Sequence, residues 1–398
     1  MFLATTALSK FWNKEEPLLF LGSWCLPYDR RKEWEGLDYS VLPDLWDDLS
    51  QSHTAINYLE QRYEGLINDL TEYLNSVHNV SHKSRYWRII LGPWLRRYLH
   101  TVYDRYCHLK EALRQQPDLD TYVLDPEDFQ TYEDTVSFSA AIRLDEYNLM
   151  IFSQILLQMG YEYPTRRLES GWPQPQVLAR ARHNSLPRVI LRIGKKVLDS
   201  IERRITAVVG RSRPIALCGM YLGSAEVWSL ALRTRLKAAP LEIKSRWSSP
   251  VPAQSKNEAR MGLSSLPASD EFSRIFAEML PANFPALYME GYKTAQTDTL
   301  RRHPKFPKVL ASLIGWSFNE PFKFLAAEAS KSGTRLVTSQ HGGLYGISRF
   351  IPEESHESNI SDSYLVWGWA HDETTAYRNL PSPKLSTEID INRKQDKL

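Results

Sequence analysis

The sequence contains few cysteines, no long apolar run and no recognisable leader. Three cysteines, an odd number without a CxxC pair, occur in the 398 residues: Cys25, Cys107 and Cys218. Neither a disulfide framework nor a structural zinc site is therefore expected, and a reducing compartment fits this content. The longest apolar runs, such as residues 150–159, fall well short of the roughly 20 residues that span a bilayer. The amino terminus has no basic region and no clear cleavage site, so we expect a cytoplasmic globular protein.

Motifs that identify several enzyme classes are also missing. The chain has no GxSxG elbow, which argues against an α/β-hydrolase, and no HExxH pair. The stretch CGMYLGS at 218–224 has two glycines but matches neither GxGxxG nor GxxxxGK[ST], so it predicts a weak anion site at best. His78 and His82 have a spacing that can bind zinc, but no third ligand is placed nearby. We therefore predict no metal site and no cofactor.

Positive charge is concentrated in one part of a nearly neutral chain. The net charge is +2, yet residues 166–213 carry 12 Lys and Arg against 3 Asp and Glu. Apolar residues at helical spacing within 186–209 predict a basic amphipathic helix. Such a helix either packs one face on the core with its basic face in solvent, or contacts an anionic membrane. Because interleaved aromatics are missing from this segment, nucleic acid is not expected as a partner.

Strands alternate with helices along most of the chain. The predicted amino-terminal elements are a strand at 15–25, several helices over 43–117 interrupted near Gly92 and Pro93, a strand at 120–128 and a helix at 145–160. The predicted carboxyl-terminal elements are strands at 213–223, 239–247, 307–316, 334–342 and 362–369, with helices at 224–236 and 319–333. This alternation predicts an α/β fold with a doubly wound sheet and a large helical insertion.

One histidine stands where such a sheet places its ligands. His341 ends the apolar strand 334–342, and Gly342 and Gly343 follow directly. Ligands of open α/β sheets lie at the carboxyl ends of the strands. A neutral histidine there can take a proton from an attacking hydroxyl, and the backbone N–H groups behind it can face a phosphate. The alternative is a histidine that only hydrogen-bonds a loop, with glycines that serve a turn.

Longer motifs around these residues resemble a known family. They are FLATTALSKFW and LFLGSWCLPYD near the amino terminus, SRYWRIILGPWL, the block from QHGGLYG to WGW, and LPSPKLS. With them the chain resembles transferases encoded in bacterial surface-carbohydrate gene clusters of the O-antigen and capsule type. Its glycine-flanked histidine is similar to that of polyol-phosphate and Kdo-type polymer transferases of GT-B architecture. The resemblance implies a GT-B-like Rossmann-type sheet and a nucleotide-activated sugar or polyol donor.

The same resemblance implies roles for individual residues. His341 would be the general base that activates a carbohydrate or lipid-linked acceptor. Gln340, Gly342, Gly343 and Tyr345 would shape the acceptor or phosphate pocket. His356 and Glu357 on the following loop, and Asp362 before the next strand, would orient His341 or bind polar substrate. The alternative for these three is a solvated loop residue or a helix cap.

The end of the first strand is expected to reach the same edge of the sheet. Gly22, Trp24 and Cys25 end that strand and are therefore predicted to bind substrate beside His341. Trp24 would stack on a sugar ring, with plain core packing as the alternative.

The resemblance also sets an expectation for domains. Residues 1–369 would form the acceptor-side α/β domain, and 370–398 a linker or tail that begins a truncated donor domain, so that the second GT-B domain is missing. Two functions from different classes follow. One is a glycosyl- or polyol-phosphate-type transferase of surface polysaccharide synthesis, cytoplasmic or peripheral at the inner membrane. The other is a non-catalytic remnant that binds carbohydrate or a lipid-linked acceptor.

Overall fold

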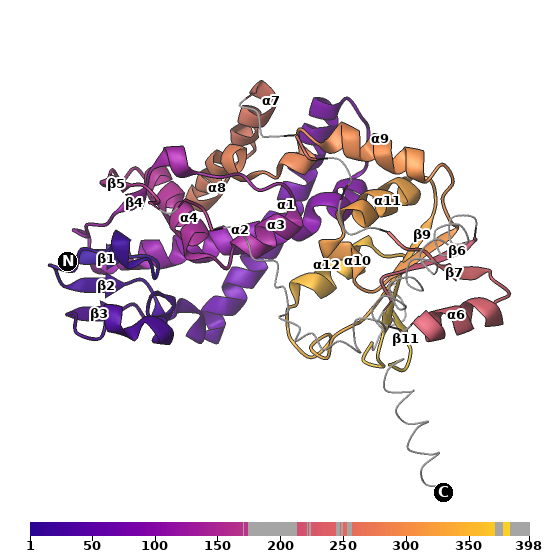
Figure 1. Cartoon of the computed structure of the whole chain (residues 1–398), viewed down its shortest axis with the longest axis horizontal. Coiled ribbons are helices and arrows are strands. Elements are labelled where there is room, and N and C mark those ends of the chain that lie inside the picture. Colours follow the sequence, from indigo (N-terminus) through magenta and orange to yellow (C-terminus); the bar gives the residue numbers. More distant parts are fainter. Residues whose placement is uncertain are drawn as a thin grey trace, which may run out of the picture. The chain divides into compact units, whose positions relative to one another are not determined.

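The computed structural model describes residues 1–169, 171–173, 213–220, 222, 224–243, 247, 250–252, 257–370 and 377–382. The chain divides into two compact units (Figure 1). The first unit comprises residues 1–80, 94–176 and 251–291, and the second comprises 81–93, 177–250 and 292–398. This division is finer than the single domain predicted over residues 1–369. The second unit also includes residues on both sides of position 369.

The first unit combines helices with short parallel strands. Its three-stranded sheet has the order β1-β2-β3, with β1 at Phe2–Ala4, β2 at Leu18–Phe20 and β3 at Tyr39–Val41. A separate pair joins β4 (Val123–Leu124) to β5 (Thr165–Arg166). The shorter helices of this unit are α3 (Thr135–Ala141), α4 (Asp145–Gln158), α7 (Glu258–Met261) and α8 (Glu271–Asn283). A strand is therefore present within the predicted range 15–25, over Leu18–Phe20, and these three residues are buried.

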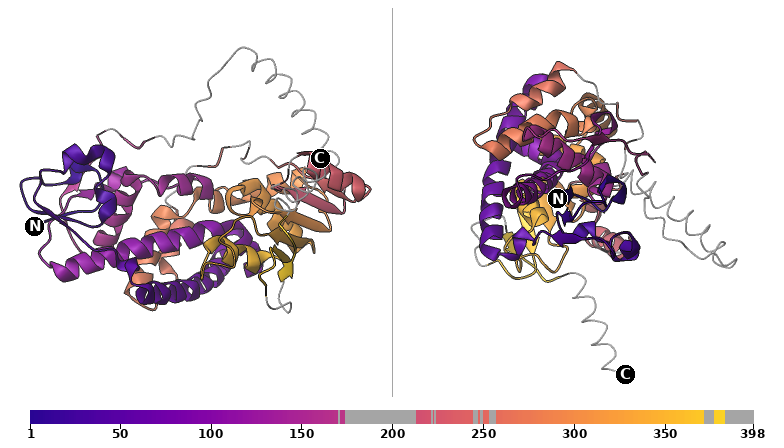
Figure 2. Two further views of the ribbon diagram at one scale, coloured as in Figure 1. Left: turned by 90° about the horizontal axis from the view of Figure 1, so that it is seen from below. Right: turned by 90° about the vertical axis from the view of Figure 1, so that its left-hand side faces the viewer.

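Two long helices form the predicted helical insertion. They are α1 (Leu49–His78) and α2 (Ser84–Gln115), of which residues 94–115 belong to the first unit. Within that unit the Arg96 guanidinium of α2 lies over the Tyr63 ring of α1 at 4.0 Å, so the two helices pack against each other (Figure 2). Arg96 also pairs with Glu60.

The break between these helices is not where the sequence predicts it. Pro93 lies inside α2, and the chain leaves the helix earlier, at Asn79, whose φ of 53° is left-handed. A proline inside a helix leaves one carbonyl without its donor and costs about 3 kcal/mol. The residues that flank it, Leu91, Trp94 and Leu95, are fully buried. Their burial outweighs the proline, whereas asparagine tolerates the left-handed conformation that ends α1.

The second unit is built on a six-stranded parallel sheet. The strands are β6 (Ile215–Cys218), β7 (Ala238–Pro240), β8 (Val309–Ser312), β9 (Arg335–Ser339), β10 (Ser363–Val366) and β11 (Tyr377–Asn379). Their order in the sheet is β11-β10-β9-β8-β6-β7, and every neighbouring pair is parallel. This confirms a mixed α/β structure with parallel strands. β11 comes from the segment that the sequence predicts as linker or tail.

The connections of this sheet run in two directions from its middle. After β6 the chain passes through α6 (Ser224–Arg233) to β7 at one edge, whereas β8, β9, β10 and β11 follow one another toward the other edge. Helices α10 (Gly315–Phe318), α11 (Glu320–Lys331) and α12 (Pro352–Ile360) lie between these strands in sequence, and α9 (Tyr292–Arg302) precedes β8. The connections leave β6 and β8 in opposite directions, which opens a crevice at the carboxyl ends of the strands.

Helix α12 is the main element that the sequence analysis missed. Residues 352–360 were expected to be loop, yet they form a helix that begins at Pro352. Proline is favoured at the first helical position, and Glu353 and Glu354 favour the first turn because the helix dipole is positive there. His356 and Glu357 therefore lie on a helix, and both side chains are buried.

Candidate functional site

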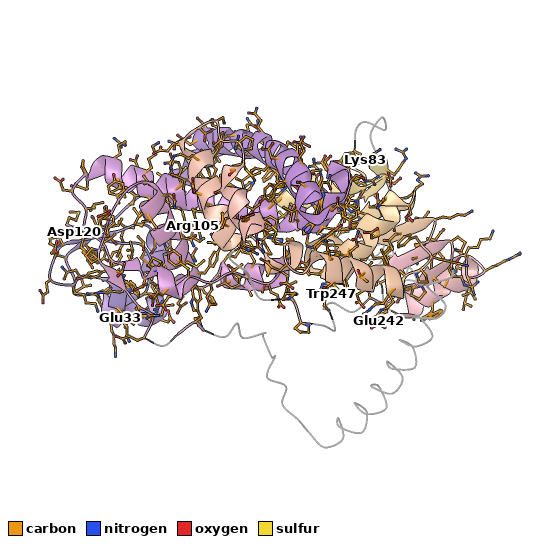
Figure 3. The ribbon with its side chains drawn as sticks, turned by 90° about the horizontal axis from the view of Figure 1, so that it is seen from above. Glu33, Lys83, Arg105, Asp120, Glu242 and Trp247 are labelled. Carbon is orange, nitrogen blue, oxygen red and sulfur yellow. The ribbon has the colours of Figure 1, made fainter. Side chains whose placement is uncertain are left out.

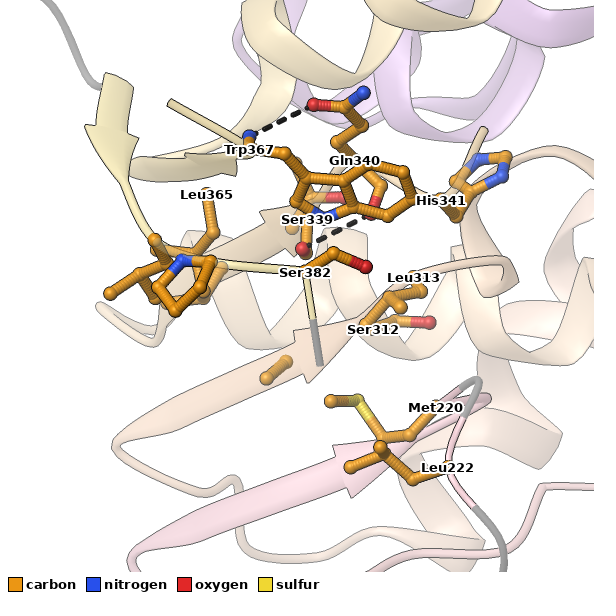
Figure 4. Close-up of a pocket in the computed structure, with 15 residues that line it drawn as sticks. Met220, Leu222, Ser312, Leu313, Ser339, Gln340, His341, Leu365, Trp367 and Ser382 are labelled. Atoms are coloured by element: carbon orange, nitrogen blue, oxygen red, sulfur yellow. Dashed lines mark hydrogen bonds between the residues drawn. The ribbon is translucent and has the colours of Figure 1, made fainter. Parts of the chain in front are cut away.

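A cavity of about 510 Å³ opens at the carboxyl ends of the second unit's sheet (Figure 4). Its walls come from the ends of β6, β8, β9, β10 and β11, from Met220 after β6 to Ser382 after β11. Most of the wall is apolar, with Leu313, Leu365 and Trp367 among its residues. His341 also lines the cavity. The predicted histidine thus stands at the edge of a parallel sheet and beside space that a ligand can fill.

The imidazole of His341 contacts a carboxylate and a phenol through the same ring nitrogen. Its Nε2 lies 3.1 Å from Glu357 Oε1 and 2.8 Å from the hydroxyl of Tyr345. The side chain of His341 is 21% exposed, whereas that of Glu357 is 1% exposed. A carboxylate buried behind a partly open imidazole fixes the ring and stabilises its protonated form. Glu357 is therefore in direct contact with His341, while the role of orienting this imidazole for catalysis stays a prediction.

Burial changes the acidity of this carboxyl group. Loss of solvent raises the pKa of Glu357 to about 7, although hydrogen bonds from His341 and Tyr364 favour the charged form. The Tyr364 hydroxyl donates to Glu357 Oε2 at 3.3 Å. Near neutral pH the carboxyl group can therefore hold or release a proton beside the imidazole.

Gln340 connects the loop after β9 to the segment after β10. Its side-chain Oε1 accepts from the Trp367 backbone N–H at 3.0 Å (dashed in Figure 4) and from the Trp369 indole N–H at 2.7 Å. Its Nε2 donates to the Gly342 carbonyl at 2.9 Å. All of these bonds are to the protein, so the amide of Gln340 holds the cavity wall in place. A contact of Gln340 with substrate stays a prediction.

The glycines of this loop have different roles. Gly346 has a φ of 72°, and a Cβ there would meet the Trp369 ring at 2.3 Å. A Cβ on Gly342 would come within 3.2 Å of the Tyr345 ring, whereas one on Gly343 would have no neighbour within 4 Å. Gly346, which the sequence analysis did not select, is therefore the position where the protein itself requires glycine. The open space at Gly343 leaves room for a ligand to approach the backbone.

Comparison with known protein families matches residues 1–398 to the LIC12162 family of transferases. This chain belongs to that family. Comparisons with curated proteins and with solved structures find no match. Membership of the LIC12162 family identifies the protein as a transferase.

Asp362 lies at the other end of the sheet from His341. It directly precedes β10, and its carboxylate accepts from the Leu336 backbone N–H near the start of β9 at 2.7 Å. It also pairs with Arg85 at 2.9 Å. Because β9 and β10 are parallel, Asp362 stands at their amino ends and His341 at the carboxyl ends. Asp362 therefore does not orient His341, and it caps no helix, because its partners are the start of β9 and Arg85. That it binds polar substrate stays a prediction.

The residues after the first strand belong to a different sheet. Gly22, Trp24 and Cys25 follow β2 in the sheet β1-β2-β3, whereas His341 follows β9 in the six-stranded sheet. The expectation of one shared sheet edge was wrong because the sequence pattern does not tell which strands pair.

The loop after β2 also has its own packing. The Trp24 indole lies over Gly22, whose Cβ would meet it at 2.1 Å, donates to the Thr5 carbonyl at 3.1 Å and remains 39% exposed. Cys25 is fully buried, and burial raises the pKa of its thiol to about 12. Its thiol contacts the Ala4 carbonyl at 3.4 Å and packs in the core of the first unit, and a contact of Cys25 with substrate stays a prediction.

Several residues of the cavity were not found from the sequence. Thr338 and Trp367 lie on predicted strands, but the sequence pattern does not show which residues of a strand line the cavity. His356 was predicted, and its buried side chain is not among the residues that line the cavity. The WGW stretch at the end of the strand predicted over 362–369 was the one available signal for Trp367.

Two features are absent from the described residues: a cluster of metal ligands and a membrane-spanning helix. Within those residues no group of three or more His, Cys, Asp or Glu side chains is placed to hold a metal ion. None of the helices in the described part of the chain is long and apolar enough to cross a membrane. The basic helix predicted at 186–209 lies outside the described residues.

Proposed function

We propose that the second-unit cavity is the site where an acceptor hydroxyl attacks a nucleotide-activated sugar or polyol donor, with His341 as general base. The observation that supports it is the position of His341 Nε2, 2.8 Å from a hydroxyl and 3.1 Å from a buried carboxylate at a cavity on the strand ends. A general base must lie within hydrogen-bond reach of the proton that it removes. His341 lines the cavity, so a hydroxyl bound there can come within this reach of the imidazole.

The proposed step moves one proton and exchanges one bond. An acceptor hydroxyl gives its proton to the imidazole of His341, whose Nε2–H donates to the ionised Glu357 carboxylate, and the hydroxyl oxygen forms a bond to the donor's sugar carbon or phosphorus. The bond from that atom to the leaving nucleotide phosphate breaks, and the phosphate takes the electron pair. The ionised Glu357 carboxylate stabilises the imidazolium that results.

The cellular role in this proposal comes from the resemblance of the motifs. Transferases of bacterial surface-polysaccharide synthesis, with GT-B architecture and a carbohydrate or lipid-linked acceptor, are the group that the motifs around Gly22 and His341 resemble. Peripheral contact with an anionic membrane through residues 186–209 is part of the same proposal.

The proposal is tested with nucleotide sugars and CDP-polyols. We expect one of them to raise the thermal unfolding temperature of the chain and to be turned over with a carbohydrate or lipid-linked acceptor. Replacement of the base, His341→Ala, should lower kcat by roughly 10²- to 10⁴-fold while donor binding persists. The matched control is His303→Ala in the same unit, outside the residues that line the cavity. Equal turnover by the wild type and His341→Ala would contradict the proposal.

One observation favours a second candidate, a non-catalytic module that binds a lipid-linked acceptor. Large apolar side chains are exposed in the segments that follow β8, β9 and β11: Ile314 at 42%, Leu344 at 68%, Ile347 at 80% and Leu380 at 49%. Exposed apolar groups of this kind are suited to a hydrocarbon chain. Binding of a lipid-linked acceptor without turnover of any donor, unchanged in His341→Ala, would favour this candidate over the transferase.

A further inference from the structure

The guanidinium group of Arg85 bonds two residues that are far from it in the sequence. Arg85 is the second residue of α2, two positions after Lys83 (labelled in Figure 3), and lies in the stretch 81–93 that belongs to the second unit. Its Nε and Nη2 donate to the Ile360 carbonyl at 3.0 and 2.7 Å, and its Nη1 donates to Asp362 Oδ1 at 3.0 Å. Nη2 also lies 2.9 Å from Asp362 Oδ2. All three nitrogens of this side chain are therefore bonded within the second unit.

The bonds to Ile360 cap a helix. Ile360 is the last residue of α12, and the last carbonyls of a helix have no intrahelical donor. An arginine that donates to such a carbonyl satisfies it, and its positive charge complements the negative end of the helix dipole. The side chain of Ile360 is fully buried, so this end of α12 is also packed in the core. Arg85 therefore holds the carboxyl end of α12 in one place.

The carboxylate of Asp362 ties the same guanidinium group to β9. Its Oδ2 accepts from the Leu336 N–H at 2.7 Å, and the Asp362 N–H donates to the Leu336 carbonyl at 2.8 Å. Although partial burial opposes it, the hydrogen bonds from Arg85 and Leu336 lower the pKa of the Asp362 carboxyl group, so it stays charged at neutral pH. Because β9 leads directly to His341, the arginine joins the end of α12 to the strand that carries the imidazole.

Helix α12 brings Glu357 to that imidazole. Glu357 lies three residues before Ile360, about one helical turn, and its backbone carbonyl accepts from the Ser361 hydroxyl at 2.6 Å. Its Oε1 lies 3.1 Å from His341 Nε2. A helix rises about 1.5 Å per residue, so a displacement of α12 by about one residue is enough to break this contact. The position of α12 along its axis therefore decides whether Glu357 reaches His341.

We propose that Arg85 is a positioning residue that, by capping α12, sets the position of Glu357 against His341. Arg85 is not among the residues that line the cavity, so it acts through Glu357 and not by contact with substrate. This gives a role to SRYWRIILGPWL, one of the motifs on which the family resemblance depends. The inference rests on the proposed function in one respect, that the pair of His341 and Glu357 is catalytic. The position of Glu357 itself can be measured without substrate.

The first test follows the ring resonances of His341 by NMR in the full chain without ligand. In Glu357→Gln the imidazole loses its carboxylate partner, which defines the spectrum of a broken contact. We expect Arg85→Gln to move the His341 resonances most of the way toward that spectrum. Hydrogen exchange of the α12 amides should become at least about tenfold faster in Arg85→Gln, whereas α6, beside the opposite edge of the sheet, should exchange as in the wild type.

The second test measures turnover and its rescue. Arg85→Gln should lower kcat by roughly 10- to 100-fold with KM within about twofold of the wild type, because the base is misplaced while the cavity wall is intact. Arg85→Lys should give an intermediate kcat, since an ammonium group keeps the charge but not the planar fork of donors. Free guanidinium ion at millimolar concentration should restore part of the turnover of Arg85→Ala. If Arg85→Gln does not fold, Arg85→Lys gives the same comparisons with smaller effects.

The matched control is Arg335→Gln. Arg335 begins β9 at the same end of the sheet, is exposed, and bonds the Ser363 hydroxyl of β10 at 3.5 Å instead of α12. We expect this variant to keep the His341 resonances, the exchange of α12 and the kinetics of the wild type.

The outcomes separate this inference from the proposed function. The inference is wrong if a folded Arg85→Gln keeps the His341 resonances and α12 exchange of the wild type. It is also wrong if α12 and α6 lose protection alike, since Arg85 would then only stabilise the unit. Displaced resonances with an unchanged kcat would instead contradict the proposed general base, because Arg85 would position a pair that catalysis does not use.

Discussion

At the scale of single residues, the pair of His341 and Glu357 determines what the site can do. A carboxyl group whose pKa is raised to about 7 by burial exchanges a proton near neutral pH, beside the imidazole of His341. The sequence alone predicted His341, because an apolar strand followed by polar residues and glycines places it at the sheet edge. The burial of Glu357 was not predictable, since it depends on which face of α12 meets β9 and β10.

The raised pKa of Glu357 predicts a pH-dependent contribution to stability. In the unfolded chain this carboxyl group loses its proton near pH 4.3, whereas in the folded chain it keeps it up to about pH 7. The folded state therefore binds more protons in this window, and the free energy of unfolding falls as pH rises through it. We expect the stability of the wild type relative to Glu357→Gln to fall by roughly 3 kcal/mol across the window, since glutamine does not titrate.

Urea unfolding of both proteins at several pH values between about 4 and 8 measures this difference, because titrations that they share cancel. A difference in stability that stays constant over the range would show that the carboxyl group keeps its ordinary pKa.

At the scale of elements, the sequence identified those with strong apolar patterns. The strands β6, β8, β9 and β10 were all found because buried parallel strands are continuous apolar runs. Helix α12 was missed because its sequence, PEESHESNI, has almost no apolar periodicity. Its place is determined by Pro352 at its start and by the packing of Glu357 and Ile360.

Two glycines in the loop after β9 are predicted to respond differently to replacement by alanine, because only Gly346 lacks room for a side chain. Gly346→Ala would force a side chain into a left-handed backbone and into the Trp369 ring, so we expect it to destabilise the chain by roughly 2 kcal/mol or more. Gly343→Ala meets no atom within 4 Å and should leave stability within about 0.5 kcal/mol of the wild type. Urea midpoints measure both effects.

Enzyme kinetics of Gly343→Ala then show whether substrate approaches the backbone at this residue. If ligand approaches the backbone there, Gly343→Ala will raise KM while the urea midpoint is unchanged. Wild-type kinetics for Gly343→Ala would show that the open space beside this residue is not used by substrate. A Gly346→Ala variant as stable as the wild type would contradict the geometry of the loop.

At the scale of the whole molecule, the sequence predicted the class of fold but not the division of the chain into two compact units. Alternating strands and helices indicated a parallel α/β sheet, and the six-stranded sheet confirms it. The assignment of β1, β2 and β3 to a second sheet was not predictable, since strands of three residues carry too little pattern to show their partners. The same limit hid β11, whose three residues, Tyr377–Asn379, follow a polar stretch.

The membership of β11 in the sheet leads to a prediction about residues 371–398. A linker or tail can be removed without cost, but β11 pairs with β10, and the Tyr377 ring packs 5.4 Å from Tyr364 and 5.5 Å from Trp369. Its end supplies Leu380 and Ser382 to the cavity wall. A chain ending at residue 370 should therefore lose roughly 3 kcal/mol or more of stability and most of its affinity for cavity ligands, because β10 becomes an open edge. Tyr377→Ala should reproduce part of the stability loss and the exposed Arg378→Ala little of it, as measured by urea unfolding. A shortened chain with unchanged midpoint and ligand affinity would mean that β11 contributes nothing to the sheet, and that these residues are a tail after all.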